Sequence, residues 1–161
     1  VEMSEMKADI RFVVLRHKIS FSGCDVSFRK ILHPGGCYAY RFSENGKNLI
    51  VATDMELREE DFADTDENSE FYRSADMIIL DSHYGPNETA GIRERGHSSN
   101  CLGVDFTGKW GIRNLVLFHY NPDFNDTRIS DLLTSAQWYS RHIPGFGAGI
   151  ILAREGLVLE V

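Results

Sequence analysis

Three short runs of apolar, β-branched residues each end at a side chain that can bind a metal ion. The junctions are Leu32-His33-Pro34-Gly35-Gly36, Ala52-Thr53-Asp54 and Leu117-Phe118-His119-Tyr120-Asn121-Pro122. Such runs predict buried strands, and the Pro and Gly residues after them predict turns. We therefore expect His33, Asp54 and His119 at strand ends. Two imidazoles and one carboxylate suit Zn, Mn or Fe, but they make only part of a two-metal site.

Length and charge narrow the class of protein. With 161 residues, 42% of them hydrophobic, the chain predicts one domain over residues 1–161 with a core of its own. A formal net charge of -7 argues against binding to extended nucleic acid or to an anionic membrane. A local phosphate site is still compatible with this charge, because a bound metal would dominate the field there.

The cysteines and the absence of a signal-like segment bear on location. The 3 cysteines lack CxxC spacing, which predicts neither a disulfide framework nor a thiolate zinc site. Without a membrane-length apolar run or a signal sequence, a cytoplasmic location is expected. The first residue is Val rather than Met, which favours a piece of a longer protein.

The remaining patterns predict a mixed α/β domain. Asn45-Gly46 between two apolar runs indicates a tight hairpin. The acidic stretch 56–70 is predicted to be a solvated loop before a short helix through residues 71–73. Ser98 or Ser99 would cap one helix, and Asp126 or Thr127 would cap the most regular one. Strands are predicted over 10–15, 23–31, 37–42, 48–52, 75–80 and 114–118, with a closing pair over 148–153 and 156–161.

Two further motifs complete a recognisable order, Leu80-Asp81-Ser82-His83-Tyr84 and Gly96-His97-Ser98-Ser99. With the three junctions, they resemble the C-terminal half of a metallo-β-lactamase-fold hydrolase, in the phosphodiesterase and ribonuclease Z-like branch. The resemblance covers roughly residues 10–161. It implies an α/β (α+β) fold, namely half of a four-layer αββα sandwich with a mixed sheet and flanking helices.

The resemblance also implies a role for each residue. His33, Asp54 and His119 would be metal ligands, with Asp54 bridging two divalent ions, of which zinc is favoured over manganese or iron. Such ions lower the pKa of a bound water, which becomes the nucleophile. His97 would contact the phosphate or protonate the leaving oxygen, and Asp81 would hold its other ring nitrogen.

One departure from the family is large, because its His-x-His-x-Asp-His stretch is absent from the chain. That stretch belongs to the N-terminal half and supplies much of the metal coordination. The resemblance therefore implies that this polypeptide alone binds metal weakly and turns over poorly. Its expected partner is the missing N-terminal half or a second copy of the chain.

Each candidate has a structural alternative. His33 and His119 also suit turn positions, and Asp54 also suits a cap or an ion pair with an arginine. His97 also suits an exposed helix start, and Asp81 a plain strand end. His83 is expected to be structural, because a continued strand would point it to the face opposite Asp81.

Three functions compete. Asp81 and His97 favour hydrolysis of a small phosphodiester or nucleotide, because a general-acid pair is not obviously needed to open a lactam. Hydrolysis of a thioester or lactone on the same fold is the second candidate. A non-catalytic assembly module is the third, since half of such a sandwich exposes an apolar sheet face.

Overall fold

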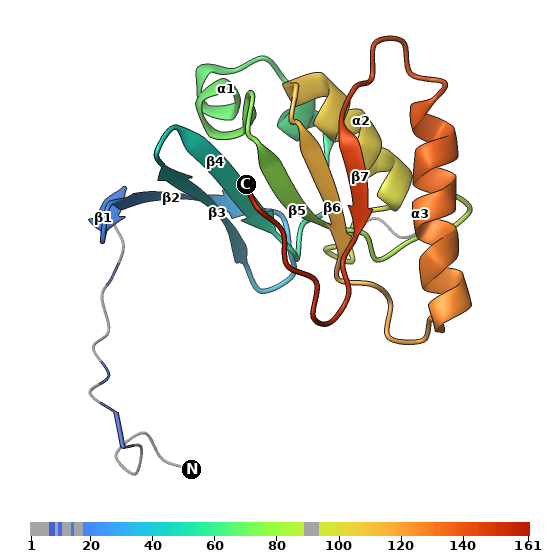
Figure 1. Cartoon of the computed structure of the whole chain (residues 1–161), viewed down its shortest axis with the longest axis horizontal. Coiled ribbons are helices and arrows are strands. Elements are labelled where there is room, and N and C mark those ends of the chain that lie inside the picture. Colours follow the sequence, from blue (N-terminus) through green and yellow to red (C-terminus); the bar gives the residue numbers. More distant parts are fainter. Residues whose placement is uncertain (1–6, 9, 11–13, 15–17, 89–93) are drawn as a thin grey trace.

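The computed structural model describes residues 7–8, 10, 14, 18–88 and 94–161, and a seven-stranded sheet forms its centre (Figure 1). The strands lie side by side in chain order; β1 to β4 pair antiparallel, and β4 to β7 pair parallel. The predicted mixed sheet is confirmed. The strands β1 to β7 span Ile19–Phe21, Cys24–Ile31, Cys37–Glu44, Lys47–Ala52, Met77–Asp81, Asn114–Phe118 and Gly149–Leu152.

The predicted hairpin joins β3 to β4. Glu44 pairs with Lys47, so the loop between them has two residues, Asn45 and Gly46, with φ angles of 49° and 77°. Two consecutive positive φ angles are typical of the turn that matches the twist of paired strands. The strand predicted over 10–15 falls largely on residues that lie outside the described part of the chain.

Among the described residues, three α-helices and one 3-10 helix accompany the sheet. The helices α1, α2 and α3 span Asp66–Tyr72, Asn100–Trp110 and Asp126–Ser140, and the 3-10 helix η2 spans Glu59–Phe62. Ser99 caps α2, which is one of the two predicted positions. For α3 both predicted caps are wrong by one or two residues, because the side chain of Asn125 accepts the hydrogen bond from the Arg128 amide.

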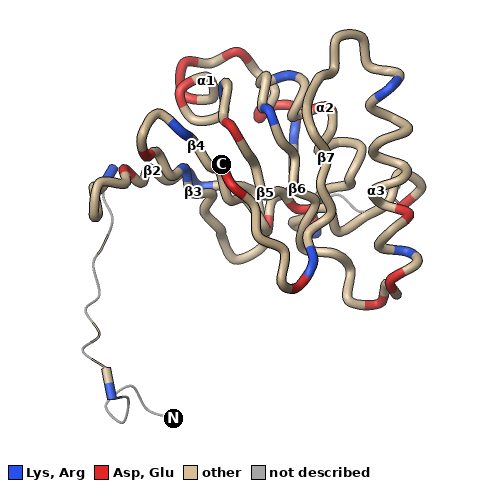
Figure 2. The backbone as a smooth tube through the Cα atoms, viewed as in Figure 1, with Lys and Arg blue, Asp and Glu red and all other residues tan. Residues whose placement is uncertain are grey.

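The acidic stretch 56–70 is more ordered than predicted. Acidic residues do gather around α1 (Figure 2), but Glu56, Leu57 and Asn68 are buried. The Asn68 side chain donates hydrogen bonds to the backbone oxygens of Glu60 and Ala63, at 2.8 Å each. This amide folds the stretch back on itself, which composition alone does not reveal.

The three α-helices cover one face of the sheet. Tyr72 from α1, Val104 from α2 and Ala136 from α3 belong to one buried cluster with Ile78 and Leu80 of β5. Since side chains alternate along a strand, the neighbouring β5 residue Ile79 points to the other face. None of the helices in the described segments has the length and apolar composition that crossing a bilayer requires.

The chain end runs over that other face and does not form the predicted closing pair. β7 pairs only with β6, and no strand follows it among residues 153–161. A turn does form, with the Leu157 amide bonded to the Arg154 oxygen at 3.1 Å. Beyond it the chain crosses the sheet (Figure 1). Val161 lines a small pocket together with Phe42 and Leu49.

Candidate metal centre

Four strands deliver polar side chains to a single edge of the sheet. β2 runs in the same direction as β4, because two antiparallel pairings separate them, and β4, β5 and β6 are parallel. Their carboxyl ends therefore meet, which is where open α/β sheets bind ligands. The residues at these ends are His33 after β2, Asp54 after β4, Asp81 ending β5 and His119 after β6.

Asp81 is the centre of the site. Its side chain is fully buried, and one carboxylate oxygen accepts from Nδ1 of His97 at 2.7 Å and lies 3.2 Å from Nδ1 of His119. The other oxygen accepts from the backbone amides of His83 and Ser98, at 3.1 Å and 3.0 Å. Burial raises the pKa of Asp81, and the bonds from His97 and Ser98 oppose that rise.

Three imidazoles surround this carboxylate. The rings of His83 and His97 are stacked, with centroids 4.3 Å apart, and those of His97 and His119 are 5.0 Å apart. One ring nitrogen from each of the three lies within 4.8 Å of the others. Within the described segments, this is the group of three whose spacing fits a metal ion, and it shares only His119 with the predicted ligand set.

The chemistry of the donors fits a divalent cation. Asp81 occupies the Nδ1 atoms of His97 and His119, so the Nε2 atom of each ring is left free for a metal or for a substrate. Nδ1 of His83 is buried and has no hydrogen-bond partner. Burial lowers the pKa of His83, followed by the charge of His97, so the neutral, ligating form is favoured.

His33 and Asp54 complete the edge. Nδ1 of His33 lies 3.0 Å from the Gly96 oxygen, and its ring centroid is 5.1 Å from that of His97. A carboxylate oxygen of Asp54 lies 3.6 Å from Nε2 of His119, and Thr53 donates to the other oxygen. Because Nδ1 of His33 faces the Gly96 oxygen, Nε2 is the ring nitrogen of His33 that is left free. All five residues selected from the sequence lie at this edge, and their individual roles stay predictions.

The backbone at His119 takes a left-handed conformation. Its φ of 56° lies in the left-handed region, which is uncommon outside glycine and is often found at functional sites. The strained residue directly follows β6 and turns its ring toward both carboxylates, with Nδ1 near Asp81 and Nε2 near Asp54. One imidazole therefore joins the two acidic residues of the site.

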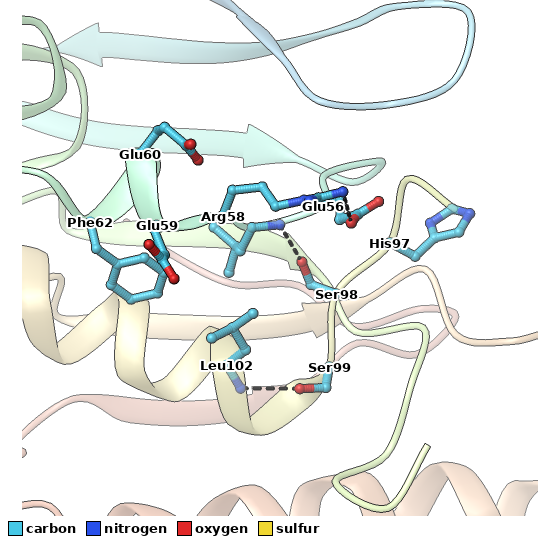
Figure 3. A pocket seen from close by; sticks show the side chains of 10 residues that line it. Glu56, Arg58, Glu59, Glu60, Phe62, His97, Ser98, Ser99 and Leu102 are labelled. Atoms are coloured by element: carbon cyan, nitrogen blue, oxygen red, sulfur yellow. Dashed lines mark hydrogen bonds and ion pairs between the residues drawn. The ribbon is translucent and has the colours of Figure 1, made fainter. Parts of the chain in front are cut away.

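A pocket of about 560 Å³ opens beside His97, between the segment after Asp54 and the start of α2 (Figure 3). Leu57, Phe62 and Leu102 supply its apolar wall. The charged lining residues are Glu56, Arg58, Glu59 and Glu60, and Ser98 and Ser99 line the pocket from the segment that leads into α2.

Two residues at or near this edge, His83 and Glu56, could not be predicted from the sequence. His83 was expected on the opposite face, but β5 ends at Asp81, so strand alternation no longer determines where the imidazole points. The bond from its amide to Asp81 instead turns the chain and places the ring on His97. Glu56 was assigned to a solvated loop although its carboxylate is buried; its position two residues after Asp54 is the only sequence signal for it.

Comparison with known proteins gives the fold. No family model matches the chain. The ribonuclease Z of Prochlorococcus marinus (strain NATL1A) is 34% identical over 95 residues, which cover 57% of this chain and 28% of that protein. The Bacillus subtilis metallo-β-lactamase fold protein YhfI is 18% identical with a TM-score of 0.69, covering 88% of this chain and 52% of that one.

A third relative is crystallised with a metal. The Zn²⁺-bound PqqB of Methylobacterium extorquens is 15% identical with a TM-score of 0.61, and the match covers 92% of this chain and 55% of that protein. The chain thus spans about half the length of these two solved relatives. It has the metallo-β-lactamase fold, as the order of its motifs predicted, and is similar over part of its length to ribonuclease Z.

Proposed function

We propose that this chain is the C-terminal half of a metal-dependent hydrolase that cleaves phosphodiesters. The observation that carries the proposal is the Asp81–His97 pair, 2.7 Å apart, at the edge to which His33, Asp54 and His119 converge. A buried carboxylate that orients an imidazole beside a candidate metal site is the arrangement expected of a proton donor. The similarity to ribonuclease Z supports phosphodiesters as the substrate class.

His33, Asp54 and His119 are the proposed ligands from this chain, and Asp54 would be the one shared by two ions. The similarity to Zn²⁺-bound PqqB supports zinc, and manganese or iron would also suit these ligands. When bound, such ions activate a water molecule and polarise the phosphoryl group. The other ligands would come from an N-terminal half, in the same protein or in a separate chain, and the isolated chain is expected to turn over poorly.

The residues of this chain have distinct tasks in the proposed reaction. Asp81 accepts the hydrogen bond from Nδ1 of His97, which fixes the ring and leaves Nε2 to face the substrate. A protonated His97 would donate from Nε2 to the leaving oxygen, or to a phosphoryl oxygen, as the bond to phosphorus breaks. Asp81 would stabilise the positive charge of the imidazolium until that proton is transferred.

The small size of the proposed substrate follows from the charge. At a net charge of -7 the chain would repel a long polyanion, and only a local site of metals and imidazoles would attract phosphate. A cyclic nucleotide or a single nucleotide linkage is therefore favoured over extended nucleic acid. The expected compartment is the cytoplasm.

The test uses the protein in a form that includes its N-terminal half, loaded with Zn²⁺ or Mn²⁺. Hydrolysis of bis(p-nitrophenyl) phosphate and of cyclic nucleotides would be compared with that of a thioester and a lactone. The variant H97A should lose at least about 100-fold in phosphodiester turnover with an unchanged metal content. H142A, which removes an exposed imidazole beside Trp138, is the matched control. Full phosphodiester turnover by H97A, or turnover of only the thioester or lactone, would overturn the proposal.

A further inference from the structure

Glu56 is a buried carboxylate that the proposed chemistry does not use. It follows Asp54 by two residues, yet its side chain reaches the separate segment that carries His97. One carboxylate oxygen accepts from the Glu94 amide at 2.9 Å, and the other from the Gly96 amide at 2.8 Å. With an exposure of 5%, the residue has little access to water as an alternative partner.

The charge of this carboxylate is compensated locally. Nη2 of Arg58 lies 2.5 Å from Glu56 (Figure 3), so an ion pair joins two residues of the same segment. Burial acts to raise the pKa of Glu56, but the amides of Glu94 and Gly96 together with Arg58 lower it below the usual range. The ionised form accepts both amide bonds, which are stronger for a charged acceptor.

A serine ties the same two segments together a second time. The Ser98 hydroxyl accepts from the Leu57 amide at 2.9 Å and donates to the Met55 oxygen at 2.6 Å. The segments after Asp54 and before α2 are therefore connected by side-chain bonds in both directions. His97 lies between Gly96, which Glu56 holds, and Ser98.

The attachment at Gly96 also limits where His97 can lie. Gly96 has a φ of +87°, and a Cβ there would approach Nδ1 of His33 to 2.2 Å. The Gly96 oxygen faces that same nitrogen at 3.0 Å. The backbone before His97 is thus held on one side by Glu56 and on the other by His33, with no room for a larger residue.

We propose that Glu56 is a positioning residue, which fixes the loop that carries His97 against the segment that carries Asp54. It would keep the proton-donating imidazole at a constant distance from the metal-binding carboxylate without touching the substrate. The catalytic consequence rests on the proposed function, whereas the link between the two segments does not. A fold-stabilising role alone would not change the rate constant of the molecules that are folded.

The first measurement needs no activity. Hydrogen exchange of the Glu94 and Gly96 amides would be followed by NMR in the wild type, in E56Q and in E59Q. In E56Q one side-chain oxygen can still accept a hydrogen bond, but an NH₂ group replaces the other oxygen and faces a backbone N–H. At least one of the two backbone amides therefore loses its acceptor, and its exchange should accelerate about 10- to 100-fold. E59Q makes the same change in charge at another residue that lines the pocket. Because Glu59 is exposed, E59Q should leave the exchange of both backbone amides unchanged.

The second measurement is kinetic and uses the metal-loaded protein with its N-terminal half. E56Q should lower kcat for bis(p-nitrophenyl) phosphate about tenfold, with KM and metal content unchanged, while E59Q should match the wild type. If E56Q does not fold, E56D keeps the charge with one methylene fewer and should show a smaller acceleration and a smaller loss in kcat.

The exchange and kinetic measurements test the positioning role of Glu56 separately from the proposed function. Unchanged exchange of both amides in E56Q and E56D would overturn the positioning role, as would altered exchange with an unaltered kcat. A wild-type protein that exchanges as expected but does not cleave phosphodiesters would refute the proposed function and leave the link between the segments intact.

Discussion

The two ends of β5 carry buried carboxylates with opposite surroundings. Asp76, just before the strand, is 6% exposed and lies 2.6 Å from Arg113 and 3.8 Å from Lys47. Asp81, at the other end, is 0% exposed, and the partners described for it are imidazoles and backbone amides. The same residue type, in nearly the same degree of burial, is paired with permanent cations at one end and with titratable rings at the other.

This difference supports a structural role for Asp76 and the functional role proposed for Asp81. Asp76 also accepts the Asn48 amide at 2.9 Å, so it joins β4, β5 and the start of β6 through permanently charged or backbone donors. A permanent cation beside Asp81 would compete with the imidazoles for the carboxylate. Because His97 and His119 take that place, Asp81 can orient both rings and respond to a proton or a metal bound to them.

The largest effect that would test this contrast is expected for D81N in the metal-loaded protein with its N-terminal half. Asparagine turns an amide group toward one of the imidazoles, so His97 loses its orientation. We expect phosphodiester turnover to fall by about 10² to 10⁴-fold. The control D76N should keep kcat per folded molecule within about twofold. Equal losses in the two variants would abolish the distinction.

The reverse effect is expected on stability. D76N removes the charged partner of Arg113 and Lys47, both largely exposed cations, and should lower the free energy of unfolding by about 1–3 kcal/mol. Urea unfolding followed by circular dichroism at pH 7 measures this loss. A D76N protein as stable as the wild type would show that Asp76 does not join the strands in the way inferred.

Metal binding sharpens the description of the Asp81 end. In the isolated chain, the three-imidazole group is the more compact set, so H83F should weaken Zn²⁺ binding about 10- to 100-fold in calorimetry. Phenylalanine keeps the stacked ring and removes its nitrogens. H33A should have little effect in the isolated chain. A large loss in H33A and none in H83F would show that the isolated chain already binds zinc through the ligands proposed for the complete protein.

The smallest effect concerns a third carboxylate, remote from the edge. Burial raises the pKa of Asp105, which accepts from the Tyr139 hydroxyl at 3.1 Å. The folded protein therefore holds this proton more tightly than the unfolded chain, and that contribution to stability is lost as pH rises from about 3.8 through the raised pKa.

D105N lacks this titration. Its free energy of unfolding, relative to the wild type, should therefore increase as the pH rises above about 3.8. Because Asp105 is only partly buried, the change should be a few tenths of a kcal/mol. Urea unfolding at several pH values measures it, and a difference that falls with pH would contradict the sign.

Much of the fold could be predicted because its signals are local. The Asn45-Gly46 turn requires two positive φ angles, and the Ser99 cap needs only the next few residues. The closing strand pair could not be predicted, since an apolar run does not say which neighbour it will pair with. β7 pairs in parallel with β6, and the residues after β7 cross the face of the sheet, where Val161 lines a small pocket with Phe42 and Leu49.

The candidate site shows the same division. The order of apolar runs and polar residues was enough to predict which residues follow the strands, and the five selected side chains do lie at one edge. Long-range contacts, which the sequence does not reveal, stack His83 on His97 and bring Glu56 to the Gly96 amide. The alternation of side chains along a strand determines which face each side chain points to, but only as far as the last paired residue. Beyond that residue, contacts between segments distant in the chain determine where each side chain points.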